Sequence, residues 1–150
     1  MNFEVQNTPP LNILLADDDT DDCIFFYKAL KEIPIATHLA TFHDGEELMN
    51  HLSFNSDHLP DLLFLDLSMP RKTGFECLDE IKENIKLKSL PIIIFSIPYN
   101  RGINYEHDMI KLLLNNGVHK YITKTTDFDQ LKKAIQILLI QATEKKLLIG

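Results

Sequence analysis

Five aspartates stand within six positions, directly after the short apolar run at residues 11–16. The segment from Asp17 to Asp22 reads DDDTDD. Carboxylates packed this closely repel one another unless a positive group joins them. Hard cations such as Mg²⁺ prefer carboxylate oxygens and often keep waters and phosphate as further ligands. The cluster therefore predicts a cation site where a buried strand gives way to a loop, with Asp17 and Asp18 as ligands.

A second interpretation explains part of the same run. Asp and Thr cap helices, and acids in a first turn interact favourably with the helix dipole. Asp19 or Thr20 is then the N-cap, and Asp21 and Asp22 are first-turn acids. We adopt this interpretation for residues 19–22, which leaves the two preceding aspartates for the cation.

Polar side chains also follow three later apolar runs. Asp66 ends the run at 61–65, Ser96 ends the run at 92–95, and Lys124 follows the run at 118–123. In open α/β sheets, ligands bind beyond the carboxyl ends of the strands. Carboxylates, a hydroxyl and a lysine at one edge suit phosphoryl transfer, in which a carboxylate can act as nucleophile and a cation neutralises charge. Asp66, after a central-looking strand, is the predicted nucleophile.

The elements that must position these side chains alternate regularly along the chain. Apolar runs predict strands at residues 11–16, 36–42, 61–65, 92–95 and 118–123. Amphipathic segments predict helices at residues 21–32, 46–52, 74–85, 105–115 and 127–141. In the third of these helices, one side is formed by Phe75, Leu78, Ile81 and Ile85. Near-continuous apolar strands joined by helices predict an α/β fold, a five-stranded parallel sheet covered on both faces.

Composition limits the other classes of function. The chain has 150 residues, about one domain, with an N-terminal extension at 1–10, a core at 11–141 and a tail at 142–150. The net charge of −7 argues against a nucleic-acid surface. No apolar run approaches the roughly 20 residues that span a bilayer, which favours a cytoplasmic protein without membrane contact. Six scattered histidines and two cysteines show no zinc-type spacing.

With these residues in order, the chain resembles the CheY-like receiver domain of two-component response regulators. The resemblance covers residues 11 to 141 and rests on the following elements: Ile13–Asp19, Asp66–Gly74 with its Asp-x-x-Met-Pro-x-x-x-Gly pattern, Ser96, Gly117 with Tyr121, and Lys124. It implies a doubly wound, flavodoxin-like (βα)5 fold.

The resemblance also implies roles for individual residues. Asp66 accepts a phosphoryl group from a sensor histidine kinase or a histidine phosphotransfer protein. Mg²⁺ or Mn²⁺ is held by Asp18, Asp66 and the backbone carbonyl of Ser68, with Asp17 acting mainly through water. Lys124 pairs with the phosphoryl group, Ser96 moves to bond it, and Tyr121 turns inward as part of the switch.

Three departures from the family pattern bear on this site. Thr125 follows the lysine where the family usually has proline, often in a cis peptide; a non-proline cis bond is costly, and the sequence leaves open whether this peptide is cis or trans. Ile97 is bulkier than the residue usual after the serine, which predicts narrower access to Asp66. Residues 98–103 resemble an insertion before the fourth helix.

Three functions remain open from the sequence. The first is a single-domain response regulator that is not an enzyme and signals through a downstream protein. The second is a receiver-like adaptor that works without phosphorylation. The third is a haloacid-dehalogenase-type phosphatase, disfavoured because its motif has a second Asp where this chain has Ser68.

Apolar residues near the C-terminus also suggest a homodimer through the helices at 105–115 and 127–141 and the tail. These residues are Ile137, Ile140, Leu147 and Leu148. Docking of the same side chains onto the domain's own core is an equal alternative.

Overall fold

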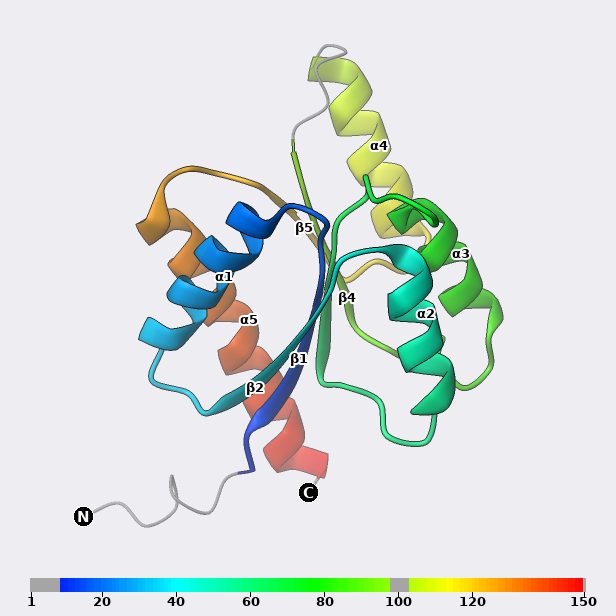
Figure 1. The fold of residues 1–150 in the computed structure, drawn as a ribbon. Helices are drawn as coiled ribbons and strands as arrows, with labels where there is room; N and C mark the ends of the chain where they lie inside the picture. Colours follow the sequence, from blue (N-terminus) through cyan, green and yellow to red (C-terminus); the bar gives the residue numbers. More distant parts are fainter. Residues whose placement is uncertain (1–8, 98–102, 150) are drawn as a thin grey trace, which may run out of the picture.

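The computed structural model describes residues 9–97 and 103–149, in which five parallel strands form one sheet flanked by five helices (Figure 1). The strands are β1 (Leu11–Ala16), β2 (Thr37–Phe42), β3 (Leu62–Leu65), β4 (Ile92–Ser96) and β5 (Lys120–Thr123). The helices are α1 (Thr20–Glu32), α2 (Gly45–Phe54), α3 (Gly74–Glu83), α4 (Ile103–Asn115) and α5 (Phe128–Ile149). The predicted doubly wound α/β fold is confirmed.

The strand order β2-β1-β3-β4-β5 places β3 at the centre of the sheet. All four residues of β3 are buried, because helices cover both faces of the sheet and leave no face for polar side chains. The ends of β1 and β4 lie on either side of the end of β3, and β5 lies next to β4. Every strand that carries a predicted site residue is therefore inside one contiguous block.

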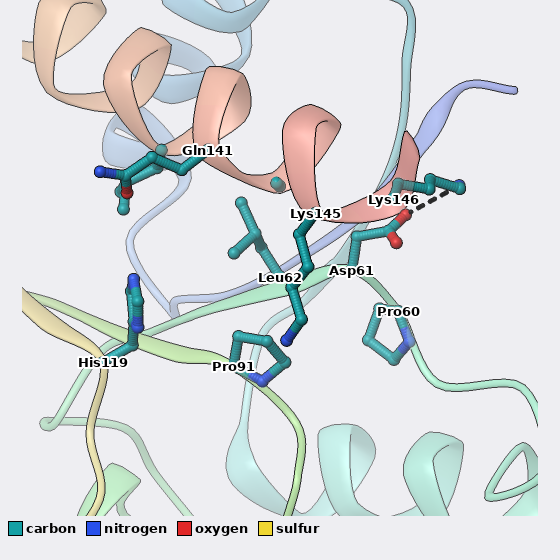
Figure 2. Close-up of a pocket in the computed structure, with 10 residues that line it drawn as sticks. Pro60, Asp61, Leu62, Pro91, His119, Gln141, Lys145 and Lys146 are labelled. Carbon is teal, nitrogen blue, oxygen red and sulfur yellow. Dashed lines mark hydrogen bonds and ion pairs between the residues drawn. The ribbon is translucent and has the colours of Figure 1, made fainter. Parts of the chain in front are cut away.

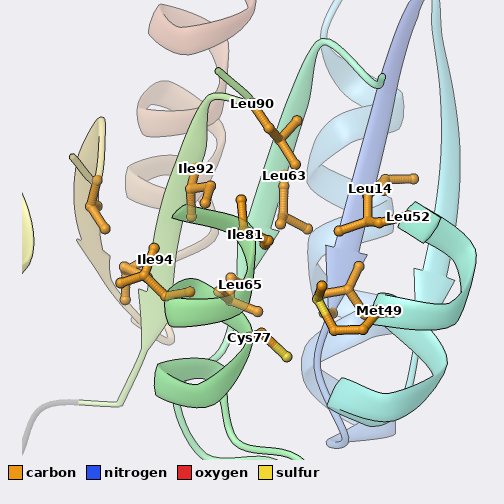
Figure 3. Packing of buried hydrophobic residues seen from close by; sticks show 14 of the residues in the cluster. Leu14, Met49, Leu52, Leu63, Leu65, Cys77, Ile81, Leu90, Ile92 and Ile94 are labelled. Carbon is orange, nitrogen blue, oxygen red and sulfur yellow. The ribbon is translucent and has the colours of Figure 1, made fainter. Parts of the chain in front are cut away.

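Two hydrophobic clusters hold the layers together. Helices α1 and α5 cover one face of the sheet, and α2, α3 and α4 cover the other (Figure 1). Successive residues of a strand point to opposite faces of the sheet and so belong to opposite clusters. Leu14 faces α2 and α3, whereas Ile13 and Leu15 face α1 and α5. Figure 3 shows the first of these clusters, in which strand residues such as Leu63 and Leu65 lie against Ile81 and Cys77 of α3.

Side-chain caps begin helices α1 and α3, and the first of these caps was predicted from the sequence. Asp19 is the N-cap of α1, and its carboxylate accepts a hydrogen bond of 3.0 Å from the Asp22 amide. Thr73 and Glu76 form a reciprocal capping box at the start of α3. These caps fix the loops that follow β1 and β3, which are the loops that carry the acidic site.

The predicted helix at 74–85 is too long. Helix α3 ends at Glu83, because Asn84 adopts an extended conformation. Ile85, predicted on the same side of this helix as the buried Leu78 and Ile81, is 81% exposed, and Phe75 is 37% exposed. Leu87 and Leu90, just beyond the helix, enter the core instead.

The final helix differs in the opposite sense. Helix α5 continues to Ile149 instead of ending at Gln141. Lys146 attaches its last turns to the sheet, since its ammonium lies 3.2 Å from the Pro10 carbonyl oxygen and 3.3 Å from the Asp61 carboxylate. Strand β1 has the predicted bounds, and the boundaries of the other elements differ from prediction by no more than two residues. The predicted insertion lies mostly in residues 98–102, outside the described residues.

Within residues 9–97 and 103–149, no helix combines the length and the apolar character that crossing a membrane requires.

The end of α3 offers a matched test of this packing. Ile81→Ala removes a fully buried side chain and should lower the free energy of unfolding by about 2–5 kcal/mol. Ile85→Ala, four residues later, should change it by no more than about 0.5 kcal/mol because that side chain is in solvent. Urea denaturation of both variants measures the difference. Equal destabilisation would show that Ile85 packs into the core as the sequence predicted.

Candidate functional site

The acidic residues predicted at the strand ends come together beyond β1 and β3. Oxygen atoms of Asp17, Asp18 and Asp66 lie within 4.8 Å of one another. Asp17 and Asp66 are buried, whereas Asp18 is exposed. Three converging carboxylates, with one of them open to solvent, can share a divalent cation that still keeps waters.

Asp66 is the residue on which the other side chains converge. Its side chain is almost completely buried, at 4% exposed for the whole residue. One oxygen, Oδ1, accepts hydrogen bonds from the Ser96 hydroxyl at 3.2 Å and from the Ser68 amide at 3.3 Å. The other oxygen, Oδ2, lies 3.4 Å from the Lys124 ammonium. Both oxygens thus face groups that can hold a phosphate oxygen.

Gly74 lets the loop after β3 fold back over this residue. A Cβ atom at position 74 would lie 2.7 Å from the Leu67 Cα and closer still to the Asp66 carbonyl oxygen. The Gly74 amide also donates a hydrogen bond of 3.0 Å to the Leu67 carbonyl. The close approach of two backbones, rather than a special φ angle, requires glycine here.

Asp17 is an ionisable group in an unfavourable place. Its Oδ1 accepts a hydrogen bond of 3.0 Å from the Asp19 amide, and its Oδ2 forms an ion pair of 2.8 Å with Lys124. Burial nevertheless raises the pKa of Asp17 to about 6, because those contacts only partly offset the desolvation. A divalent cation would favour the charged form, so the buried carboxylate fits a metal ligand.

Lys124 contacts three carboxylates at once. Its ammonium lies 2.8 Å from both Asp17 and Asp22 and 3.4 Å from Asp66, and its side chain is only 9% exposed. Burial by itself lowers the pKa of Lys124, but hydrogen bonds to Asp17 and Asp22 and the charge of Asp66 together raise it above its ordinary value. The lysine is therefore held charged inside the site.

The Asp22 contact was missed from the sequence, which assigned this residue only to the start of a helix. Asp22 does lie in the first turn of α1. Helical side chains point back towards the N-terminus of their helix, and here that direction leads to the end of β1. This directional rule was the available signal, but the position of Lys124 comes from a segment 102 residues later.

The remaining predicted residues take the following places. The Lys124–Thr125 peptide, left open by the sequence, is trans, since the described residues contain no cis peptide bond. The Lys124 amide donates to the Ser96 carbonyl at 2.8 Å, which joins the ends of β4 and β5. Tyr121 is partly buried and packs against the cluster that includes α4 residues. Ile97 is 62% exposed.

The donor set fits a hard divalent cation. Its side-chain donors are carboxylate oxygens only, without imidazole or thiolate, which suits Mg²⁺ or Mn²⁺ better than softer metals. The Ser68 carbonyl, predicted as a further ligand, belongs to an exposed residue two positions after Asp66. The predicted assignment of this carbonyl stays a prediction.

An apolar cavity lies at the other end of the sheet, away from the acidic cluster. It has a volume of about 380 Å³ and lies between the last turns of α5 and the starts of β3 and β4 (Figure 2). Its walls include Leu62 and Pro91, and the Asp61–Lys146 ion pair stands at its rim. It shares no residue with the acidic cluster.

Comparison with known proteins agrees with the geometry. The model of the response regulator receiver domain matches residues 13–136. The response regulator Rcp1 of Synechocystis sp. is 32% identical over 135 residues, which cover 87% of this chain and 88% of that protein.

Two solved structures extend the comparison. The Mn²⁺-bound form of response regulator Rcp1 superposes with a TM-score of 0.71 at 30% identity, covering 86% of this chain and 91% of that one. The phosphorylated cyanobacterial phytochrome response regulator RcpA superposes with a TM-score of 0.72 at 30% identity, covering 87% of this chain and 91% of that one.

The buried charge of Asp17 predicts a stability difference that depends on pH. The pKa of 3.8 in the unfolded chain rises to about 6 on folding, so the folded state binds more protons between these values and loses stability as pH rises through them. When a chelator removes divalent cations, Asp17→Asn should therefore raise the free energy of unfolding by about 1–2 kcal/mol near pH 7 and by much less below about pH 4.

Urea denaturation at the two pH values measures this effect. Asp79→Asn removes an exposed carboxylate of α3 and should change the stability little at either pH. If Asp17→Asn is no more stable than the unaltered protein near pH 7, Lys124 already offsets the cost of burying the carboxylate.

Proposed function

The chain belongs to the response regulator receiver domain family of two-component signalling, and from that premise we propose that Asp66 accepts a phosphoryl group from a phosphohistidine. We propose a phosphoacceptor whose product is a signalling state, rather than an enzyme acting on other molecules. The observation that carries the proposal is the environment of Asp66. It is a buried carboxylate contacted by Ser96, Lys124 and the Ser68 amide.

The phosphoryl transfer needs only the phosphohistidine, the Asp66 carboxylate and water. A carboxylate oxygen of Asp66 attacks phosphorus, the new O–P bond forms, and the N–P bond of the phosphohistidine breaks. Its electron pair returns to the imidazole nitrogen, which takes up a proton from water. Developing charge on the phosphoryl oxygens is the main electrostatic demand on the site.

Three carboxylates can stabilise part of this developing charge indirectly, because they can hold a cation. We assign Mg²⁺ to Asp17, Asp18 and Asp66, with the Ser68 carbonyl as a further donor and Asp17 acting mainly through water. The cation, when bound, neutralises charge on the phosphoryl oxygens. Asp18, exposed and adjacent to the buried pair, lies where a partly hydrated ion would enter.

Lys124 and Ser96 can stabilise the charge on the phosphoryl oxygens directly. Lys124 lies beside Asp66 Oδ2 with a buried side chain, so its ammonium can pair with a phosphoryl oxygen with little screening by water. The Ser96 hydroxyl lies beside Oδ1 and can donate to the phosphoryl group after a small movement. We propose that this movement, followed by Tyr121 turning inward, transmits the phosphorylated state.

The proposed partners follow from this chemistry. The donor is a sensor histidine kinase or a histidine phosphotransfer protein, and the output is contact with a downstream protein. Because such donors are phosphorylated with ATP as the phosphoryl source, we propose a cytoplasmic location. A homodimer through α4 and α5 would use Ile137 and Ile140, which are 49% and 44% exposed. Of Leu147 and Leu148 the structure describes the helical backbone and not the side chains.

The proposal is tested by covalent labelling. The protein incubated with Mg²⁺ and acetyl phosphate should gain the mass of one phosphoryl group, and Asp66→Asn should abolish the gain because no other carboxylate among the described residues has the same contacts. Intact-protein mass spectrometry measures both. Asp57→Asn, which removes an 81%-exposed carboxylate, serves as the control and should label normally. Absence of labelling in the unaltered protein would favour the adaptor that works without phosphorylation.

The cation assignment is tested separately. Asp18→Asn should weaken Mg²⁺ or Mn²⁺ binding by about tenfold or more, because it removes an anionic ligand from the cluster. Isothermal titration with Mn²⁺ measures the affinity. Asp19→Asn is a matched control, since asparagine also caps helices well and the carboxylate at 19 is occupied by its own helix. Similar losses in both variants would indicate a general effect of charge instead of ligation.

A further inference from the structure

Asp22 holds the lysine of the site more closely than the proposed phosphoacceptor does. The Lys124 ammonium lies 2.8 Å from Asp22 Oδ2 and 3.4 Å from Asp66 Oδ2. Asp22 belongs to the first turn of α1, and Lys124 follows β5. The ion pair therefore joins the helix after β1 to the loop before α5, beside the acidic cluster.

An ammonium group has three N–H donors, and three carboxylates already surround this one. A phosphoryl group on Asp66 would add negative charge and further acceptors beyond the Asp66 carboxylate. Lys124 can turn towards these acceptors only by loosening one of its present contacts.

Solvent exposure decides which contact is easiest to loosen. The Asp17 side chain has no exposure, so losing Lys124 would leave a buried carboxylate without its cationic partner. The Asp22 side chain is 32% exposed, so water can replace the ammonium there. Asp22 is therefore the partner that Lys124 can leave at the lowest free-energy cost.

On the basis of the function proposed above, we propose that Asp22 is a positioning residue. It restrains Lys124 in the unphosphorylated state and thereby weakens the affinity of the site for a phosphoryl group. Phosphorylation transfers Lys124 from Asp22 to the phosphoryl oxygens and opens the link between α1 and the loop before α5. The simpler role of a first-turn acid on the helix dipole applies equally to Asp21, which is exposed and forms no ion pair among the described residues.

Beryllofluoride, a phosphoryl analogue, tests the proposal in the presence of Mg²⁺. Asp22→Asn should bind beryllofluoride about three- to fivefold more tightly than the unaltered protein, the upper part of the range expected for releasing a partly exposed ion pair. Asp21→Asn makes the same change of charge one residue earlier and should leave the affinity within about twofold. Asp22→Glu keeps the carboxylate and should return the affinity towards that of the unaltered protein.

A second background separates positioning from general charge. In Lys124→Met, Asp22→Asn should no longer change the beryllofluoride affinity, because the residue acts through the lysine. Thermal unfolding of each variant checks that it is folded, and a fall in unfolding temperature without a change in affinity would assign Asp22 a structural role only.

The outcomes distinguish this inference from the proposed function. If the unaltered protein binds no beryllofluoride and takes no phosphoryl group, both fail. If it binds but Asp22→Asn binds equally or more weakly, or if Asp21→Asn shows the same gain, only the inference is overturned. A gain confined to Asp22→Asn and dependent on Lys124 supports it.

Discussion

The structure depends on the burial of carboxylates beside a single ammonium group. Asp17 and Asp66 are buried at the edge of the sheet, and Lys124 is the cation that contacts both. The balance is incomplete, since burial still raises the pKa of Asp17. A site left with excess negative charge attracts a divalent cation and, through it, a phosphoryl group. The destabilising charge is thus the same feature that creates the binding site, which is a common reason for strain at functional positions.

The parallel sheet makes this arrangement possible. Parallel strands bring all their carboxyl ends to one edge, and the order β2-β1-β3-β4-β5 places the strands that carry site residues side by side. The central strand β3 ends directly before Asp66, which is only 4% exposed. Gly74 then allows the following loop to pack against the backbone of Asp66. The backbone that carries Asp66 is therefore packed against the core, and the movements proposed above involve side chains such as those of Lys124 and Ser96.

Several parts of the fold were predictable because local chemistry decides them. Apolar runs of strand length can satisfy burial only inside a covered sheet, so β3 and β4 were identified from residue types alone. The predictions failed at helix ends. Ile85 continued the apolar period of α3, but Asn84 ended the helix and Leu87 took the buried place. The continuation of α5 past Gln141 was missed because its last turns are held by Lys146 contacts to Pro10 and Asp61, which are remote in sequence.

By itself, the sequence determined the class of fold, and it predicted which acids, serine and lysine follow the strands, although it assigned Asp22 only to the start of a helix. These follow from residue types at strand ends, which a parallel sheet necessarily brings to one edge. Only the tertiary structure decided how Lys124 divides its contacts among Asp17, Asp22 and Asp66. That division depends on differences of less than 1 Å in the distance from the Lys124 ammonium, in the loop after β5, to three carboxylates. These carboxylates lie at the end of β1, in α1 and at the end of β3. Such distances arise from the packing of whole elements, and no local pattern encodes them.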